Sequence, residues 1–246
     1  MAWIALFFGA YNVPPIMVLK ILLSAIGIDF NLGDIQEKAI ILDIRLPRVI
    51  LAGLVGAALA SSGVALQGLF HNPLVDPYIL GISAGAAFGC AITIGYLSFL
   101  PLQLTAFIFS LIAVTLAYSI ASLQDESSRL PLVLSGVIVS AFFTAMVSLV
   151  KFLVDPHKLQ SIVYWLMGSF SLADWRSVKI ASIGISLGVL PIYLMRWKLN
   201  VISMGEEEAK SLGINTKMQR LLIISFASLS VAVATSLCGI IGWVGL

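Results

Sequence analysis

The sequence predicts an all-α fold, a polytopic bundle of helices that cross a membrane. Hydrophobic residues make up 60% of the 246 positions and charged residues 11%, whereas about 25% is typical of soluble domains. The mean hydropathy of +1.06 would leave a soluble protein with more exposed apolar surface than water tolerates. Long uncharged runs also recur along the chain, and roughly 20 apolar residues suffice to cross a hydrocarbon core of about 30 Å. Lipid is therefore the predicted solvent for most of this chain.

We expect about six complete spans, with partial first and last segments. The complete spans fall in uncharged runs at 49–69, 77–124, 130–150, 180–195 and 221–246. The run 77–124 is long enough for two helices, and Pro101 predicts the turn between them. Gly239 predicts a break in the last run. Residues 1–10 resemble the last half of a span, and they lack the basic start and cleavage site of a signal peptide.

The sequence also predicts where helices meet lipid and where they meet each other. Residues 14–26 predict a short helix in the membrane interface, with Lys20 extending toward the headgroups. Its expected apolar positions include Ile16, Leu19, Leu23 and Ile26. Small residues in the first complete span predict a close approach of helices, because packing contacts drive helix association in lipid. These residues are Gly53, Gly56, Ala60 and Gly63.

Composition and motifs argue against several classes of function. The net charge of +2 is too small for a nucleic-acid surface, and the isolated cysteines and histidines predict no metal site and no cofactor. The motifs of serine hydrolases, zinc proteases and phosphate-binding loops do not occur in the sequence. Ionisable residues are missing from the middle of most predicted spans. This pattern disfavours an ion-coupled secondary transporter and an intramembrane enzyme, both of which need such residues.

The first polar feature is the Arg-Leu-Pro-Arg sequence at 45–48, which precedes the first complete span. Pro47 suits the first turn of a helix, where its missing N–H is no loss. Arg45 and Arg48 would share one face of that helix, and a guanidinium can bind a carboxylate through two parallel hydrogen bonds. From the residues alone, the pair is either a set of interfacial anchors or a binding surface for an acidic partner.

The second polar feature is the segment 67–77, which links two predicted spans. Two prolines four positions apart exclude a regular helix through it. Asn72 and Asp76 are suited to bond exposed backbone groups, and Asp76 is a candidate cap for the next helix. The segment is either an ordinary tight loop or backbone that faces a cavity rather than lipid.

The third polar feature is 196–220, the one sizeable charged segment. Residues 205–213 predict a short surface helix, because glutamates in its first turn suit the helix dipole and Gly213 suits a left-handed end. Ala209 and Leu212 leave a small apolar face. A helix that docks on a partner needs such a face and a solvated connector does not, but spacing alone does not separate these alternatives.

Basic residues do not fix the orientation of the chain in the membrane. If 11–48 lies outside, alternation of the spans places 196–220 inside. Six basic residues then lie inside and eight outside, which contradicts the usual excess of positive charge on the inner side.

Together these segments resemble the FecCD-type permeases, the membrane subunits of ABC importers for iron-siderophores, haem, vitamin B12 and related chelates. The resemblance covers essentially the whole chain. It rests on Arg-Leu-Pro-Arg at 45–48, Asn-Pro-Leu-x-x-Pro-x-x-Leu-Gly at 72–81, Tyr-Trp-Leu-Met-Gly-Ser-Phe at 164–170 and Gly-Glu-x-x-Ala-x-x-Leu-Gly at 205–213. It implies the helical bundle of the vitamin B12 importer permease. A single transmembrane permease domain would cover 1–246, with an extracytoplasmic segment at 11–48 and a cytoplasmic coupling segment at 196–220.

The resemblance also implies roles for individual residues. Arg45 and Arg48 match arginines that grip acidic residues on the two lobes of a substrate-binding protein. Residues of the cytoplasmic gate loops match Asn72 and Leu74 in one loop and, approximately, Ser127 and Ser128 in the other. The run 130–150 matches the helix that lines the pathway at the dimer axis. The coupling helix that fits a groove of the ATPase matches Gly205, Glu206, Glu207, Ala209, Leu212 and Gly213.

Partners and location follow from the same resemblance. It implies two ATP-binding cassette subunits, an extracytoplasmic substrate-binding protein, a second permease copy or close paralogue, and the lipid bilayer, without nucleic acid. ATP hydrolysis would belong to the partner ATPase, so the chain itself is not expected to be an enzyme. The expected location is the cytoplasmic membrane of a prokaryote. Family permeases have more spans than are predicted here, so C-terminal spans and the start of the first span are expected to be missing.

Overall fold

The computed structural model describes residues 6–7, 11, 13–25, 35–123 and 130–242, and it confirms the all-α prediction for them. Every regular element in these ranges is a helix, and one of them, η1, is a π-helix. The elements are α2 (Pro15–Ala25), α3 (Ile35–Ala39), η1 (Ile40–Arg45), α4 (Leu46–Phe70), α5 (Ile82–Gly95), α6 (Leu102–Ser122), α7 (Leu130–Leu153), α8 (Pro156–Leu166), α9 (Trp175–Leu194), α10 (Arg196–Met204), α11 (Glu206–Ser211) and α12 (Thr216–Cys238).

The predicted complete spans correspond to α4, α5, α6, α7, α9 and α12. In the described part of the chain, five helices are long and apolar enough to cross a membrane, and α5 is the shorter exception with 14 residues. Such a helix is only about 21 Å long. The predicted turn at Pro101 lies between α5 and α6, and α12 ends where Gly239 was expected to break the last run.

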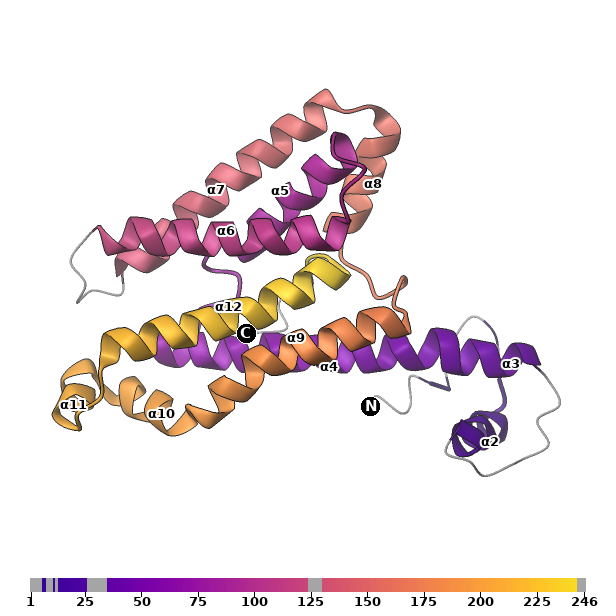
Figure 1. Cartoon of the computed structure of the whole chain (residues 1–246), viewed down its shortest axis with the longest axis horizontal. Helices are drawn as coiled ribbons and strands as arrows, with labels where there is room; N and C mark the ends of the chain where they lie inside the picture. The colour runs from indigo at the N-terminus through magenta and orange to yellow at the C-terminus, as the bar shows by residue number, and fades with distance from the viewer. Residues whose placement is uncertain (1–5, 8–10, 12, 26–34, 124–129, 243–246) are drawn as a thin grey trace.

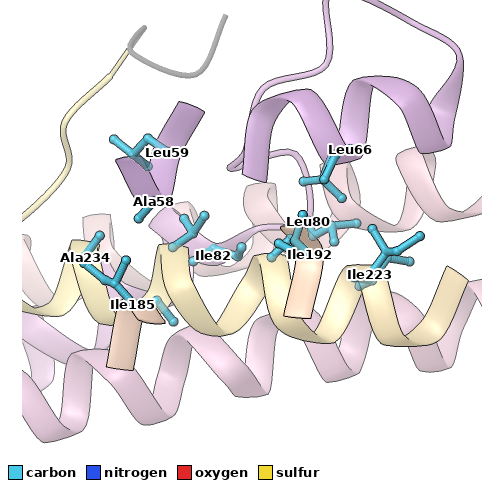
Figure 2. Packing of buried hydrophobic residues seen from close by; sticks show 14 of the residues in the cluster. Ala58, Leu59, Leu66, Leu80, Ile82, Ile185, Ile192, Ile223 and Ala234 are labelled. Atoms are coloured by element: carbon cyan, nitrogen blue, oxygen red, sulfur yellow. The ribbon is translucent and has the colours of Figure 1, made fainter. Parts of the chain in front are cut away.

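The helices form two groups that α12 brings together (Figure 1). In one group, α5 packs against α6, α7 and α8; in the other, α4 packs against α9. Helix α12 contacts α4, α9 and α6, so it is buried more completely than the other spans. Figure 2 shows part of the main core, in which α4, α9, α12 and the start of α5 meet. It includes Leu59, Leu66, Leu80, Ile82, Ile185, Ile192, Ile223 and Ala234.

Helices α5 and α6 approach each other through glycines. A Cβ added at Gly89 would lie 2.6 Å from the carbonyl oxygen of Thr105, and one at Gly85 would collide with the carbonyl oxygen of Phe109. Nearby, the hydroxyls of Thr93 and Thr105 are 2.6 Å apart. Gly85 and Gly89 thus form a small-xxx-small interface of the kind used between membrane helices.

The small residues predicted to pack on α4 behave differently. Nothing in the described part of the chain lies within 4 Å of a Cβ added at Gly53 or Gly56, and Ala60 is exposed. Gly63 is buried. Gly53 and Gly56 therefore make no close helix approach within the described part of the chain, unlike Gly85 and Gly89 of α5.

Helix α2 belongs to a small cluster at one end of α4. Its side chains Val18 and Ile21 are buried together with Leu6, Val13 and Ile41. The expected apolar positions Ile16 and Leu19 are exposed, which suits side chains that face lipid. The helix therefore carries apolar residues on two sides, one against the protein and one open, and Ile26 lies outside the described residues.

Candidate functional site

The first candidate site lies at the start of α4, where Arg45 is buried with only 8% of its surface exposed. Its Nη1 donates a hydrogen bond of 2.8 Å to the carbonyl oxygen of Leu6, and its Nη2 donates to that of Tyr11. Arg45 ends the π-helix η1, and Pro47 falls in the first turn of α4 as predicted. The guanidinium therefore fastens an early segment of the chain to the start of a span.

Arg48 is half-buried and fastens a different segment. Its Nε donates to the carbonyl oxygen of Phe170 at 3.2 Å, and its Nη2 donates to that of Ser171 at 3.1 Å. Nearby, Nε1 of Trp175 donates to the carbonyl oxygen of Leu42 at 3.0 Å. Together these bonds attach the loop before α9 to the region around η1. The structure thus gives the two arginines different surroundings, and their role in docking stays a prediction.

At the other end of α4, the predicted irregular segment occupies 71–81. Oδ1 of Asn72 accepts a hydrogen bond from the backbone N–H of Leu74 at 2.9 Å, and Oδ1 of Asp76 accepts one from that of Tyr78 at 2.7 Å. Asp76 therefore shapes a turn and does not cap α5. The cap position of α5 is Gly81, whose φ of 83° is left-handed and suits glycine.

Burial divides this segment into two parts. Leu74 is 79% exposed, whereas Val75 and Leu80 are almost fully buried. Irregular backbone is tolerated at membrane depth only where protein or water covers it, and protein covers the second part here. Asn72 and Leu74 lie in the open first part, as a gate residue would need, but their role stays a prediction.

His71, regarded above only as an isolated histidine, connects this segment to α10. It ends α4 with a left-handed backbone, φ 51°. Its Nε2 lies 2.8 Å from the carbonyl oxygen of Ile202. A carbonyl oxygen only accepts, so Nε2 carries the proton and donates. No feature of the sequence indicated this contact, because α10 itself was not predicted.

The predicted surface helix at 205–213 is confirmed as α11, Glu206–Ser211. Gly213, with φ 76°, ends it in a left-handed conformation. The N–H of Gly213 bonds the carbonyl of Lys210 at 2.9 Å, and that of Ile214 bonds the carbonyl of Ala209 at 3.0 Å. These two bonds are the pattern of a Schellman end.

The expected apolar face of α11 is divided. Ala209 is fully buried in the main core, whereas Leu212 is 61% exposed and Glu207 is exposed. Ala209 therefore fastens α11 to its own chain, and Leu212 is left for contact with something else. The side chain of Glu206 is not among those described, and Ser127 and Ser128 lie outside the described residues.

Helix α7, which contains the run 130–150, has one buried face and one open face. Gly136 lies on the buried face, where an added Cβ would collide with the carbonyl oxygen of Ile79. Large side chains on the open face include Leu134, Val137, Ile138, Phe142 and Leu149. This arrangement suits a helix whose open face meets a pathway or another subunit. Among the described residues, no three His, Cys, Asp or Glu side chains are grouped to hold a metal ion.

The family described as the FecCD transport family matches residues 1–246 of this sequence. The chain belongs to the FecCD transport family. FecCD relatives include a Helicobacter pylori (strain ATCC 700392 / 26695) protein named as an iron chelatin transport system permease. This chain is 48% identical to it over 207 residues, which cover 84% of this chain and 63% of that protein.

The substrates named for FecCD relatives differ. The molybdate import system permease protein MolB of Haemophilus influenzae is 39% identical over 215 residues, which cover 87% of this chain and 64% of MolB. The chain thus spans less than two thirds of the length of both relatives. A solved structure of a metal-chelate type ABC transporter in an inward-facing conformation matches with a TM-score of 0.80 and 35% identity. That match covers 94% of this chain and 76% of the solved chain. This chain and the solved chain therefore share one fold.

Proposed function

We propose that this chain is a transmembrane permease subunit of an ATP-driven importer. Its substrate is an iron-siderophore, haem, cobalamin or a similar metal chelate, which it moves across the cytoplasmic membrane of a prokaryote. Two copies, or this chain and a close paralogue, form the pathway between them, and two partner ATP-binding cassette subunits hydrolyse the ATP. The observation that carries the proposal is that α4 has one family motif at each end. Arg-Leu-Pro-Arg (45–48) is at its start, and Asn-Pro-Leu-x-x-Pro-x-x-Leu-Gly (72–81) follows its end.

Helix α4 separates those motifs by the thickness of a membrane. It contains 25 residues and is therefore about 37 Å long. The Arg-Leu-Pro-Arg motif is at its start, and His71 at its end contacts α10 of the 196–220 segment. We place 11–48 on the extracytoplasmic side, where a substrate-binding protein docks. The coupling segment 196–220 is then cytoplasmic and faces the ATPase.

Docking would use Arg45 and Arg48 in different ways. Arg48 is half-buried and leaves part of its guanidinium open to a carboxylate of the substrate-binding protein. Arg45 is buried and donates to the carbonyls of Leu6 and Tyr11, so it acts by fixing the start of α4. A docked partner therefore meets the charge of Arg48 on a surface that Arg45 holds in place.

Coupling would use the two sides of α11. Leu212 and Glu207 are exposed and form the part that enters a groove of the ATPase. Ala209 is buried in the core and transmits the movement of α11 to the bundle. Gly205 and Gly213 bound the helix, and Glu206 completes its first turn. Asn72 and Leu74 form one side of the cytoplasmic gate, and Ser127 and Ser128 form the other.

The test is ATP-dependent uptake into proteoliposomes that contain the permease, its ATPase and its substrate-binding protein. A ferric siderophore, haem, cobalamin and molybdate are offered separately. We expect accumulation of one chelate that requires ATP and persists when ionophores collapse all ion gradients. Leu212→Glu should weaken ATPase binding. The same change at Leu153, which is similarly exposed, should not, because Leu153 ends α7 on the side proposed to be extracytoplasmic. Uptake without the ATPase, or uptake abolished by the ionophores, would refute the proposal.

A further inference from the structure

We infer that His71 is a positioning residue that transmits movement of the coupling segment to the gate. The inference rests on the function proposed above and adds a physical connection to it. That connection runs from α10 through the His71 side chain into the 71–81 segment, and from there to α7.

The first part of the connection is the hydrogen bond from Nε2 of His71 to the carbonyl oxygen of Ile202, 2.8 Å. Ile202 is in the last turn of α10, Arg196–Met204, where carbonyls have no partner within the helix. His71 satisfies one of them from another helix. Ile202 is itself 4% exposed, whereas His71 is exposed, so the bond joins a surface side chain to a residue of the core. Helix α11 begins two positions after α10 ends and contacts it, so a displacement of α11 reaches α10 and this bond.

The second part is the 71–81 segment itself. The gate residues Asn72 and Leu74 follow His71 by one and three positions. The Asn72 side chain accepts a hydrogen bond from the backbone of Leu74 and so closes a turn. Gln67 Nε2 donates to the carbonyl oxygen of Val75 at 3.3 Å and ties the turn back to α4. A turn held by these two hydrogen bonds moves as a unit, so a force on His71 displaces the gate residues together.

The third part is the contact between the segment and α7. An added Cβ on Gly136 of α7 would collide with the carbonyl oxygen of Ile79. One on Gly81 would lie 3.3 Å from Cγ1 of Val139. Backbone therefore packs directly on helix, without a long side chain that could absorb a displacement. A shift of the segment is passed to α7, whose open face is proposed to line the pathway.

The backbone of His71 allows a sharp test, because its left-handed conformation and its side-chain bond can be changed separately. Asparagine and glycine both accept the left-handed φ of 51°, but neither reaches the carbonyl of Ile202. Glutamine is long enough to place an amide N–H near that carbonyl. The matched control is His157→Asn, the same substitution at the other histidine, which is exposed at the start of α8.

Reconstituted importers carrying each variant are assayed for ATP hydrolysis and for uptake of the chelate that the unaltered importer accepts. We expect His71→Asn and His71→Gly to hydrolyse ATP normally but to move about fivefold less chelate per ATP. His71→Gln should recover most of that ratio, and His157→Asn should match the unaltered protein. Thermal unfolding in detergent identifies variants that are merely unstable. If His71→Asn is unstable and His71→Gly is stable, the glycine variant alone is used.

A second measurement reports the movement itself. Spin labels at the exposed positions Leu74 and Lys210 give a distance between the gate and α11 with and without ATP. We expect ATP to change this distance in the unaltered protein, and His71→Asn to reduce the displacement of the gate label. An unchanged transport-to-hydrolysis ratio in both His71→Asn and His71→Gly overturns the inference and leaves the proposed function intact. Lack of any ATP-dependent uptake by the unaltered importer would refute both the inference and the proposed function.

Discussion

Ser62 of α4 and Ser230 of α12 share a hydrogen bond of 2.9 Å between their hydroxyl oxygens, inside the membrane-spanning bundle. Ser230 also reaches the carbonyl oxygens of Phe226 and Ala227 in its own helix. Helix α9 also approaches Ser230, because an added Cβ at Gly188 would lie 2.7 Å from the Cβ of Ser230. Three spans therefore meet at one small, polar contact, where each hydroxyl has a partner.

Removing one hydroxyl from this contact should have a small effect. Ser62→Ala leaves Ser230 bonded to its own helix, so we expect the free energy of unfolding to fall by about 0.6 kcal/mol. Titration with a denaturing detergent, followed by circular dichroism, measures the change. The control is Ser61→Ala, because Ser61 bonds the carbonyl of Ala57 in its own helix. Equal losses from both variants would show that the contact between α4 and α12 adds nothing.

Added volume at the α5–α6 interface should cost much more. Gly89→Ala would place its Cβ 2.6 Å from the Thr105 carbonyl oxygen, so the helices must separate. We expect a loss of about 2 kcal/mol in the same denaturation assay. Gly53→Ala provides the matched control, since no described atom lies within 4 Å of its Cβ. That variant should be neutral or stabilising by up to about 1 kcal/mol, because alanine favours helix. A comparable loss from both would contradict this account.

Local signals in the sequence predicted those parts of the fold that local physics decides. The uncharged runs gave the spans, Pro101 gave the turn before α6, and Gly213 gave the end of α11. Which glycines pack could not be deduced, because Gly53 and Gly89 both lie in apolar helices and differ only in what stands opposite. Likewise, the different partners of Arg45 and Arg48 could not be deduced, because the two side chains are identical and lie three positions apart.

The candidate site shows the same boundary between local and distant contacts. The turn at Asn72 follows from an asparagine before proline, whereas the bond from His71 to Ile202 joins positions 131 residues apart. The division of α11 into a buried Ala209 and an open Leu212 depends on where α12 and the core lie. No spacing rule within one helix contains that information.

Acid should loosen the start of α9. Asp174 caps this helix by accepting hydrogen bonds from Ser177, and these hold the pKa of its carboxyl below the usual 3.8, with a smaller contribution from Arg176. Because the folded pKa is lowered, the stabilisation is complete above about pH 3.8 and is lost as the pH falls through the folded pKa. Hydrogen exchange of the first turn of α9 at pH 6 and at pH 3 should show faster exchange in acid, after correction for intrinsic rates.

Two substitutions isolate the carboxylate of Asp174. Asp174→Asn keeps the hydrogen-bond acceptor without the titrating group, so its cap should lose the acid sensitivity. Asp174→Ala removes the cap at every pH and should cost the helix end about 1 kcal/mol. If the asparagine variant kept the same acid response, another group would be responsible.

Replacing each arginine by lysine should loosen different segments. An ammonium cannot reproduce the forked donor of Arg45, so Arg45→Lys should speed hydrogen exchange in α2 and η1, which pack around Leu6. Arg48→Lys should instead speed exchange in the loop that contains Phe170 and Ser171. Each variant serves as the control for the other. The same segment responding to both would contradict the separate roles assigned here.

These two arginines also differ in when their bonds become possible as the chain is synthesised. Arg45 bonds Leu6 and Tyr11, residues 39 and 34 positions earlier, so its partners have already left the ribosome when it emerges. Arg48 must wait for Phe170, 122 positions later. Closing the longer loop costs more chain entropy, whereas the N-terminal cluster around Leu6 forms without closing it. The start of α4 is therefore expected to become ordered in two stages, first against the early segment and last against the loop that follows α8.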